Sequence, residues 1–411
     1  MKRPEILSPA GNFEKLRSAI LYGADAVYLS GKIFGMRSAA DNFTVTEMKE
    51  AVEYAHSFGR KVYLTLNTMP RESEYEALRS YLSSLKEIPL DAMIIGDIGV
   101  LMLVREMLPE MEIHISTQAN AVSSQDCMAW YKLGAKRVVL ARELSLEDIK
   151  AIRASIPEEL ELECFIHGSM CVSYSGRCLL SGHMIGRDAN RGMCAQPCRW
   201  NYSIRNYEIT EEKRPELSMP IEEHNGETFI MSSRDTCMIE HIPELIEAGI
   251  NSFKIEGRMK SAYYAAVVTN AYRMACDSYF SGNYKYDPAW YRELLSVSHR
   301  NYATGYYFTD SYSDANIAED AGYIREKAYL AVVLEYNKET GEALMSQRNK
   351  LTLGEPLEVI SPGKIGEPLF CEALYNEAHE PIESAPHPYM TFYMKTDKEL
   401  KRGDIVRAGE N

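Results

Sequence analysis

Five of the nine cysteines in this chain fall in one stretch, and their spacing could support metal chemistry. The pattern is Cys171-x6-Cys178-x15-Cys194-x3-Cys198, followed by Cys237. Zinc ribbons usually pair their ligands in C-x2-C knuckles, and this stretch contains none. Thiolates at irregular spacing suit a four-iron cluster at least as well as zinc. The sequence therefore predicts an iron–sulfur cluster held by four of these five cysteines.

The competing interpretation is that the cysteines are buried and pack as small hydrophobic groups. We apply it to the other four, which lie in regularly patterned segments: Cys127, Cys164, Cys276 and Cys371. The odd number of cysteines argues against a disulfide framework, and the start of the chain lacks the apolar core of a signal peptide. We therefore expect a cytoplasmic protein, in which closely spaced thiols are ligands or catalytic groups.

The net charge of −14 disfavours a general nucleic-acid binder, although a local basic cleft on an acidic body can still bind RNA. Trp290–Arg292 and His299–Tyr302, with Tyr306 and Tyr307, combine the cationic and aromatic side chains that RNA binding uses. The alternative, which we favour, is an aromatic seam that joins two domains.

The elements that would position these residues repeat over the first 260 residues. Short apolar runs alternate with helical stretches, and the runs are typical of strands covered on both faces. The runs are Glu5–Ala10, Ala26–Ser30, Lys61–Asn67, Ala92–Asp97, Glu112–Gln118, Arg137–Arg142, Glu161–His167 and Ser252–Glu256. Eight repeats predict an α/β fold, a closed (β/α)8 TIM-like barrel. An open doubly wound sheet is the alternative, which the lack of G-x-G-x-x-G after the first run disfavours.

Three helices have recognisable patterns. Thr46–Phe58 has Thr46 as its expected N-cap and Gly59 just past its end. Ser145–Ile156 starts with Ser145 and Asp148 in a pattern like a capping box. A longer helix is expected over Ala262–Phe280.

An insertion after the seventh run, from Gly168 to Ile250, carries the five clustered cysteines. Its polar stretch Glu208–Thr228 indicates an exposed loop or hairpin. On a barrel the insertion would emerge at the carboxyl ends of the strands, where active sites lie. We expect a catalytic barrel domain over residues 1–324, with its cysteine-rich insertion at 168–250, and a small β-barrel-like domain over residues 325–411. Strands of the second domain are predicted at Tyr329–Glu335, Glu342–Gln347, Pro356–Ile360 and Asp404–Val406.

The segment Glu163–Cys171, continuing through Gly176–Ser181, resembles the signature of the collagenase-like peptidase family U-32. The other segments similar to that family are Ser8–Gly11, Gly23–Tyr28, Arg187–Gly192, Cys198–Trp200, Ser233–Asp235, Lys254–Lys260, and Ser298–Arg300 with Gly305. The resemblance covers most of the chain and includes a C-terminal domain of the kind found in the tRNA-modifying branch.

The resemblance implies a (β/α) barrel with a 4Fe-4S cluster on Cys171, Cys178, Cys194 and Cys237, with Cys198 as the alternate to Cys194. It also implies that the chain hydroxylates the wobble uridine of tRNA at carbon 5, with prephenate as co-substrate. Relatives act on ribosomal RNA or in quinone synthesis, and these substrates are alternatives. A non-catalytic role in a modification complex, with a protein partner from the same family, is another.

Prephenate carries two carboxylates, which Arg and Lys side chains bind well. The expected substrate-binding residues lie at predicted strand ends or in the insertion: Arg142, Arg187, Arg234, Lys254, Gln118 and Asn120, with Asn67 in a similar position. Three residues are expected to be catalytic: His167 as a proton shuttle, Glu256 as an acid or base, and Arg258 beside it. Structural roles compete with each of these, as ion pairs, as caps or as a histidine that supports the cysteine loop.

A collagenase-like peptidase is the alternative function. The sequence contains neither HExxH nor GxSxG, and His167 and Ser169 are only two residues apart on one strand end. A cysteine bound to iron is not free to attack a peptide bond. We therefore expect an iron–sulfur RNA-modifying enzyme whose barrel binds prephenate and a flipped-out base.

Overall fold

The computed structural model describes residues 2–37, 40–171, 173–174, 177–199, 209–211, 214–219, 222–224, 227–229, 233–309 and 323–409. Gly176 and Trp200 of the family signature lie outside these ranges. The chain divides into two compact units, one of residues 1–16, 25–259 and 299–324, and one of residues 17–24, 260–298 and 325–411. None of the helices in the described ranges combines the length and apolar character that a membrane span requires.

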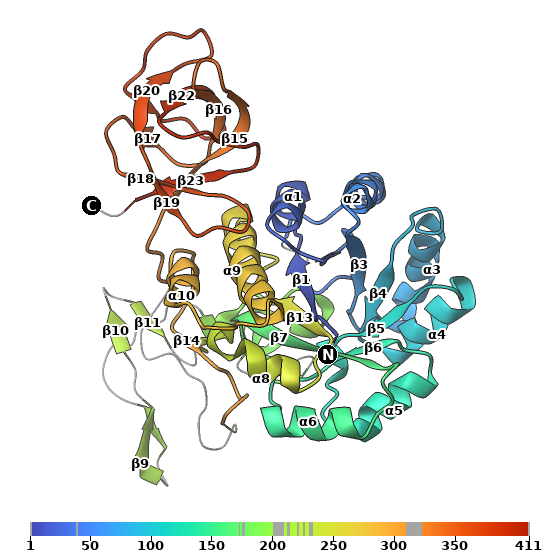
Figure 1. The fold of residues 1–411 in the computed structure, drawn as a ribbon. Helices are drawn as coiled ribbons and strands as arrows, with labels where there is room; N and C mark the ends of the chain where they lie inside the picture. Colours follow the sequence, from blue (N-terminus) through green and yellow to red (C-terminus); the bar gives the residue numbers. More distant parts are fainter. Residues whose placement is uncertain are drawn as a thin grey trace. The chain divides into compact units, whose positions relative to one another are not determined.

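The first unit contains a closed barrel of parallel strands (Figure 1). Around the barrel the strands are β1 (Glu5–Pro9), β2 (Ala26–Leu29), β3 (Lys61–Leu66), β4 (Ala92–Ile95), β5 (Ile113–Ile115), β6 (Arg137–Val139), β7 (Glu161–Ser169) and β13 (Ser252–Ile255). β13 pairs with β1 on one side and with β7 on the other, which closes the ring. Each of the eight predicted runs coincides with one strand, the seventh strand extending two residues beyond its run, so the predicted TIM-like barrel is confirmed.

A helix follows each of the first six strands along the chain, and α2 to α6 lie around the outside of the strands in Figure 1. The helices are α1 (Phe13–Leu21), α2 (Val45–Ser57), α3 (Tyr75–Ser84), α4 (Ile98–Met107), α5 (Ser124–Lys132) and α6 (Leu146–Ala154), with α8 (Ile242–Glu247) just before β13. The buried residues of α2 show the helical spacing expected of a face packed on a core: Met48, Ala51, Val52 and Ala55.

The helix ends test two predictions about capping. The predicted capping box of α6 is confirmed, with Ser145 as N-cap and Asp148 as its partner. The predicted N-cap Thr46 of α2 is wrong by two residues. Thr44 caps the helix instead, because its side chain accepts from the amide of Glu47 while the Glu47 carboxylate accepts from the amide of Thr44.

The insertion after β7 begins with short helical pieces, α7 (Leu180–Ile185), η3 (Ala189–Arg191) and η4 (Pro197–Arg199). The stretch predicted as a loop or hairpin forms two antiparallel pairs, β8 (Ile209–Glu211) with β9 (Arg214–Met219) and β10 (Glu222–His224) with β11 (Glu227–Phe229). The predicted exposure of this stretch stays a prediction, because its side chains are outside the described part of the structure. The insertion returns through β12 (Asp235–Cys237), which pairs antiparallel with the end of β7.

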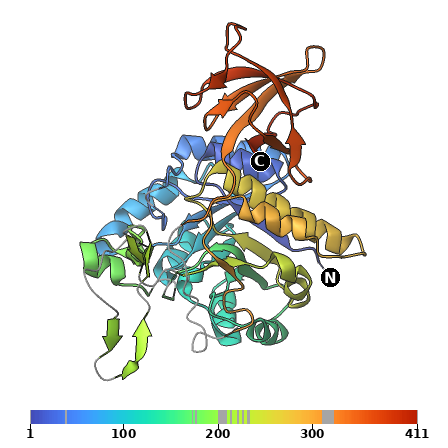
Figure 2. The same cartoon turned by 90° about the vertical axis from the view of Figure 1, so that its left-hand side faces the viewer.

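The second unit contains α9 (Ala262–Phe280), as predicted, α10 (Pro288–Leu295) and an antiparallel sheet of seven strands (Figure 2). In order the sheet is β19 (Glu367–Leu369), β18 (Leu357–Ile360), β23 (Ile405–Ala408), β15 (Tyr329–Asn337), β16 (Glu342–Gln347), β22 (Thr391–Thr396) and β20 (Cys371–Tyr375). A smaller pair joins β17 (Leu351–Thr352) to β21 (Ser384–Ala385). The four predicted strands are all present, while the domain boundary at residue 325 and the β-barrel-like form stay predictions.

A buried ion network links the barrel strands. Arg137 binds Glu5 at 2.6 Å, Glu161 at 2.7 Å and Glu163 at 3.1 Å, and Lys254 binds Glu163 at 2.6 Å. Glu163 is fully buried, so its two cationic partners replace the water that a carboxylate would otherwise need. The network thereby fixes the amino group of Lys254.

This network predicts how stability depends on pH. Burial alone would raise the pKa of Glu163, but Lys254 and Arg137 lower it from 4.5 to about 2. A carboxylate with a depressed pKa stabilises the fold above its unfolded pKa and loses that contribution as pH falls through its folded pKa. We therefore expect the free energy of unfolding to decrease between pH 4.5 and about 2.

Glu163→Gln should flatten that part of the profile and cost about 3–5 kcal/mol at neutral pH, because it leaves the buried Lys254 without its carboxylate partner. Urea unfolding across the acid range measures both effects. Glu106→Gln, which removes only an exposed pair with Arg79, is the control and should resemble the wild type. An unchanged acid profile in Glu163→Gln would contradict the prediction.

Candidate active site

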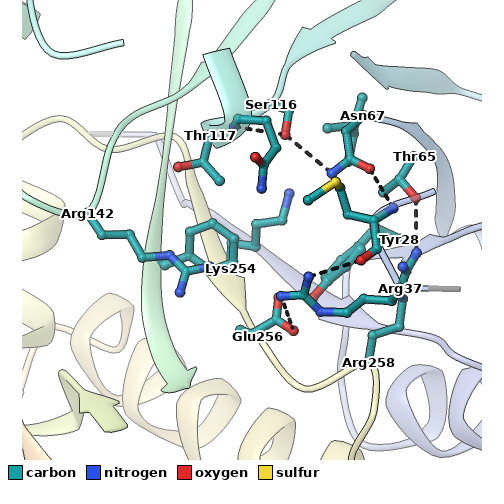
Figure 3. A pocket seen from close by; sticks show the side chains of 14 residues that line it. Tyr28, Arg37, Thr65, Asn67, Ser116, Thr117, Arg142, Lys254, Glu256 and Arg258 are labelled. Atoms are coloured by element: carbon teal, nitrogen blue, oxygen red, sulfur yellow. Dashed lines mark hydrogen bonds and ion pairs between the residues drawn. The ribbon is translucent and has the colours of Figure 1, made fainter. Parts of the chain in front are cut away.

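The carboxyl ends of the barrel strands surround a pocket of about 50 Å³ (Figure 3). Its lining comes from β2 to β7 and β13, or from the loops that follow these strands. The lining residues are Tyr28, Met36, Arg37, Thr65, Asn67, Ile94, Ser116, Thr117, Gln118, Arg142, Phe165, Lys254, Glu256 and Arg258. Active sites of this fold lie at this end of the barrel, so the pocket is the candidate active site.

Four cationic side chains converge on the pocket around the carboxylate of Glu256 (Figure 3). Arg37 Nη2 lies 3.9 Å from Glu256 Oε1. Arg258 is buried and donates from Nη1 to Thr65 Oγ1 at 3.0 Å. The other two cations, Arg142 and Lys254, approach from β6 and β13.

Arg142 and Lys254 are held by fixed partners. The guanidinium of Arg142 lies over the ring of Phe165 at 3.8 Å and donates to the carbonyl of Ser169 at 2.7 Å. Lys254 donates to Glu163 at 2.6 Å and lies 4.7 Å from the centre of the Tyr28 ring. Because Glu163 neutralises Lys254, the described lining residues present three guanidinium groups for the one carboxylate of Glu256. The pocket is therefore net positive and suits an anion.

The charges also set the protonation of the site. Burial alone would raise the pKa of Glu256, but Arg37, Arg142 and Arg258 lower it, so this side chain is a carboxylate at neutral pH. Burial and the nearby Arg37 lower the pKa of Arg258 to about 10, so its guanidinium stays charged. Gly168 at φ +106° lets the backbone approach here, because a Cβ at this position would lie 2.2 Å from the carbonyl of Glu256.

A polar wall faces the cations. Asn67 accepts from the amide of Met36 at 3.2 Å and donates to Ser116 Oγ at 3.4 Å. Ser116 Oγ also accepts from the amide of Gln118 at 3.2 Å. The side-chain oxygen of Gln118 is buried and accepts no hydrogen bond from the described residues, so it can receive an N–H or O–H from a ligand.

The structure brings six of the predicted residues together in this pocket: Asn67, Gln118, Arg142, Lys254, Glu256 and Arg258. Arg37 was missed by the sequence reasoning. It lies in the loop between β2 and α2, beyond the end of the second run, and its only sequence signal was a basic residue in a loop after a strand. Tyr28, Thr65 and Ser116 were missed as well.

The other four predicted residues do not line the pocket. His167 is buried on β7, with Nε2 3.3 Å from the hydroxyl of Tyr302. Asn120 ends η2 (Thr117–Ala119) in a left-handed conformation, Arg187 is exposed after α7, and Arg234 lies directly before β12. Their expected roles stay predictions.

None of the five clustered cysteines forms a disulfide. Cys237 is on β12 opposite His167, and Cys171 is exposed just past β7. Cys194 and Cys171 both act electrostatically on Arg37, which places them near the pocket. Gly192 supports this placement, since a Cβ there would lie 2.5 Å from the carbonyl of Gly35.

The chemistry of the five clustered cysteines suits a thiolate-bound cluster. They are unbridged thiols, partly or fully accessible except for Cys237, which is buried on β12. The described residues nevertheless contain no group of three or more His, Cys, Asp or Glu side chains arranged to hold a metal ion. The cluster therefore rests on the donor types and stays a proposal.

A buried ion pair fixes the strand that carries Cys237. Arg300 binds Asp235 of β12 through Nη2 at 2.7 Å and Nε at 3.1 Å, and both residues are about 2% exposed. Trp290, His299 and Tyr306, from the segments considered for RNA binding, are buried as well. These side chains thus pack inside the fold and offer no surface to RNA.

Comparison with known proteins identifies relatives of the whole chain. Residues 11–316 match the family model of Peptidase family U32, and residues 325–407 match that of the Peptidase family U32 C-terminal domain.

The chain is 36% identical over 414 residues to tRNA hydroxylation protein P1 of Bacillus subtilis, covering 100% of this chain and 96% of that protein. It is 34% identical over 436 residues to tRNA hydroxylation protein P of Escherichia coli, covering 98% and 95%. It is 31% identical over 371 residues to a protein named Collagenase of Porphyromonas gingivalis, covering 87% and 86%.

Proposed function

The chain belongs to peptidase family U32, and from this premise we propose that it is an RNA hydroxylase that acts on tRNA. Two relatives that match almost its full length are named tRNA hydroxylation proteins. In the finer form of the proposal, the substrate is carbon 5 of the wobble uridine and prephenate is the co-substrate. The reaction would take place in the cytoplasm.

The observation that carries the proposal is the positive charge of the pocket. Arg37, Arg142 and Arg258 surround a single carboxylate there, and prephenate brings two more carboxylates. Guanidinium groups bind carboxylates through paired hydrogen bonds, and burial strengthens such pairs. The buried oxygen of Gln118 supplies an acceptor for a hydroxyl of the co-substrate or for the N–H of a flipped-out base.

Glu256 is the group in the pocket that can accept a proton. Its carboxylate lies 3.4 Å from the hydroxyl of Tyr28 and beside Arg37, so its orientation is fixed from two sides. An ionised, oriented carboxylate can accept a proton from a bound substrate, and this is the role that we propose for Glu256.

The proposed 4Fe-4S cluster would be held by Cys171, Cys178, Cys194 and Cys237, with Cys198 as the alternate to Cys194. When bound, such a cluster supplies electron transfer or rigidity to the segment that carries it. The Arg300–Asp235 pair keeps Cys237 in place independently of any metal.

The test is hydroxylation by protein purified and reconstituted without oxygen. Unmodified tRNA is incubated with and without prephenate, and its nucleosides are analysed by mass spectrometry. We expect the mass of one oxygen atom to be added at the wobble uridine only when prephenate is present. Product on ribosomal RNA or a quinone precursor alone, or activity only after a second family member is added, would overturn this form of the proposal.

Peptidase activity is the second candidate, because the relative from Porphyromonas gingivalis is named Collagenase. Among the described residues that line the pocket, none is His or Cys, so the nucleophile–base pair of a cysteine peptidase is not found there. Gelatin cleavage that disappears in Cys171→Ser would favour this candidate, and we expect no cleavage by the wild type.

A further inference from the structure

A stack of aromatic and cationic side chains lies on the C-terminal antiparallel sheet. The rings of Tyr263 and Tyr329 are stacked with centroids 5.5 Å apart. The guanidinium of Arg348 lies over Tyr329 at 5.9 Å and over Tyr389 at 4.9 Å. The stack thus leads from the buried α9 residue Tyr263 to Tyr389, which is 69% exposed.

Two loops build the outer end of this stack, and hydrogen bonds hold them together. The amide of Tyr389 donates to the carbonyl of Gln347 at 3.2 Å. Arg348 Nη1 donates to Ser346 Oγ at 2.7 Å and to the carbonyl of Gln347 at 2.9 Å, which orients the guanidinium plane. The stack is therefore organised before any ligand arrives.

Tyr389 adopts φ +63°, a left-handed conformation that aromatic residues rarely take. Strained backbone conformations cluster at active sites and ligand-binding sites. Here the conformation accompanies a large aromatic ring that stays in solvent, with a cation over one face. Packing within the sheet does not account for this ring.

The charges beside Tyr389 suit phosphate. Lys350 and His387, from the same two loops, are both exposed. Lys350 adds a positive charge to that of Arg348 on a chain whose net charge is −14. An exposed ring with cations beside it is the arrangement that binds single-stranded nucleic acid, since bases stack on the ring and phosphates meet the cations.

We propose that Arg348, Lys350, His387 and Tyr389 form a binding site for an unpaired segment of RNA, with one base stacked on Tyr389. The identity of this RNA as tRNA rests on the proposed function. The aromatic-plus-cationic character favours RNA over a protein partner.

The test measures how the full-length protein binds an unmodified tRNA transcript, by fluorescence anisotropy at two salt concentrations. Tyr389→Gly removes the ring at a position where glycine accepts the positive φ, so the fold should be kept. We expect this variant to bind about tenfold more weakly, as for loss of one stacked base. Tyr389→Trp should bind like the wild type, because it keeps an aromatic ring. Lys350→Gln should lower the slope of log affinity against log salt concentration by about one, because one phosphate contact is lost.

Phe370→Ala is the matched control, because Phe370 is 62% exposed in the same domain and should not affect binding. The site would be overturned if Tyr389→Gly and the wild type bound the tRNA with equal affinity. The same conclusion would follow if Tyr389→Gly lost a protein partner while its affinity for RNA stayed unchanged. If the wild type hydroxylates tRNA and Tyr389→Gly has the same KM for it, the site fails while the proposed function holds. Tyr389-dependent RNA binding without any hydroxylation would instead overturn the proposed function.

Discussion

Replacing Cys171 or Cys178 with alanine is expected to remove iron from the protein and to abolish hydroxylation. A cubane cluster needs four thiolate ligands, and no other cysteine lies within six residues of Cys171 or of Cys178 to substitute for either of them. Iron and sulfide analysis of anaerobically purified protein should give about four of each per chain for the wild type. The variants should lack both iron and sulfide, and they should lack the brown colour of the wild type. This readout does not depend on the activity assay.

Two further variants make this result specific. Cys127→Ala changes a buried cysteine of α5 and should retain iron, because burial raises the pKa of that thiol to about 12 and keeps it protonated. Cys194→Ala and Cys198→Ala should differ in iron content, since only one of these two cysteines is needed as a ligand of the cluster. We expect Cys194→Ala to lose iron and Cys198→Ala to keep it.

Full hydroxylation by protein that contains no iron would contradict the catalytic role of the cluster. Zinc bound in place of iron after anaerobic reconstitution would contradict the cluster itself. In either case the pocket cations remain, so the binding of a carboxylate co-substrate can still be tested separately.

The barrel could be predicted from the sequence because each strand is short, apolar and covered on both faces. Runs such as Lys61–Asn67 therefore carry a strong signal within a few residues. The C-terminal sheet was predicted less completely. β22 and β20 alternate between buried and more exposed residues over only a few positions, a weak signal, whereas β15 extends over nine residues.

Only part of the site could be predicted, because the sequence pattern indicates where strands end but does not indicate which residues are in contact. Lys254, Glu256 and Arg258 were placed correctly in the pocket, since they follow a clear strand. Arg37 comes from a loop whose path depends on tertiary contacts. Conversely, Asp235 and Arg300 belong to motifs shared with the family, but together they form a buried structural pair. Motif residues thus include supports as well as ligands.

Arg258→Gln is expected to raise KM for prephenate about a hundredfold, because losing one partner of a buried charge pair costs about 2–5 kcal/mol. The Arg258 guanidinium is buried and already positioned by Thr65, so glutamine cannot supply the charge or the paired hydrogen bonds. If this contact is present in both the bound substrate and the transition state, kcat should change much less than KM. Steady-state kinetics with prephenate as the varied substrate separate the two.

The control for Arg258→Gln is Arg60→Gln, which removes a cation at the amino end of β3, away from the pocket. Arg60 pairs with Asp25 at 3.3 Å on a partly exposed surface, and such pairs contribute little. Thr65→Val is the graded test, since it keeps the charge of Arg258 but removes the oxygen that orients it. KM should then follow the order wild type, Thr65→Val, Arg258→Gln. A KM for prephenate that is the same in all three proteins would place the co-substrate outside this pocket, because Arg258→Gln removes a buried cation that lines it.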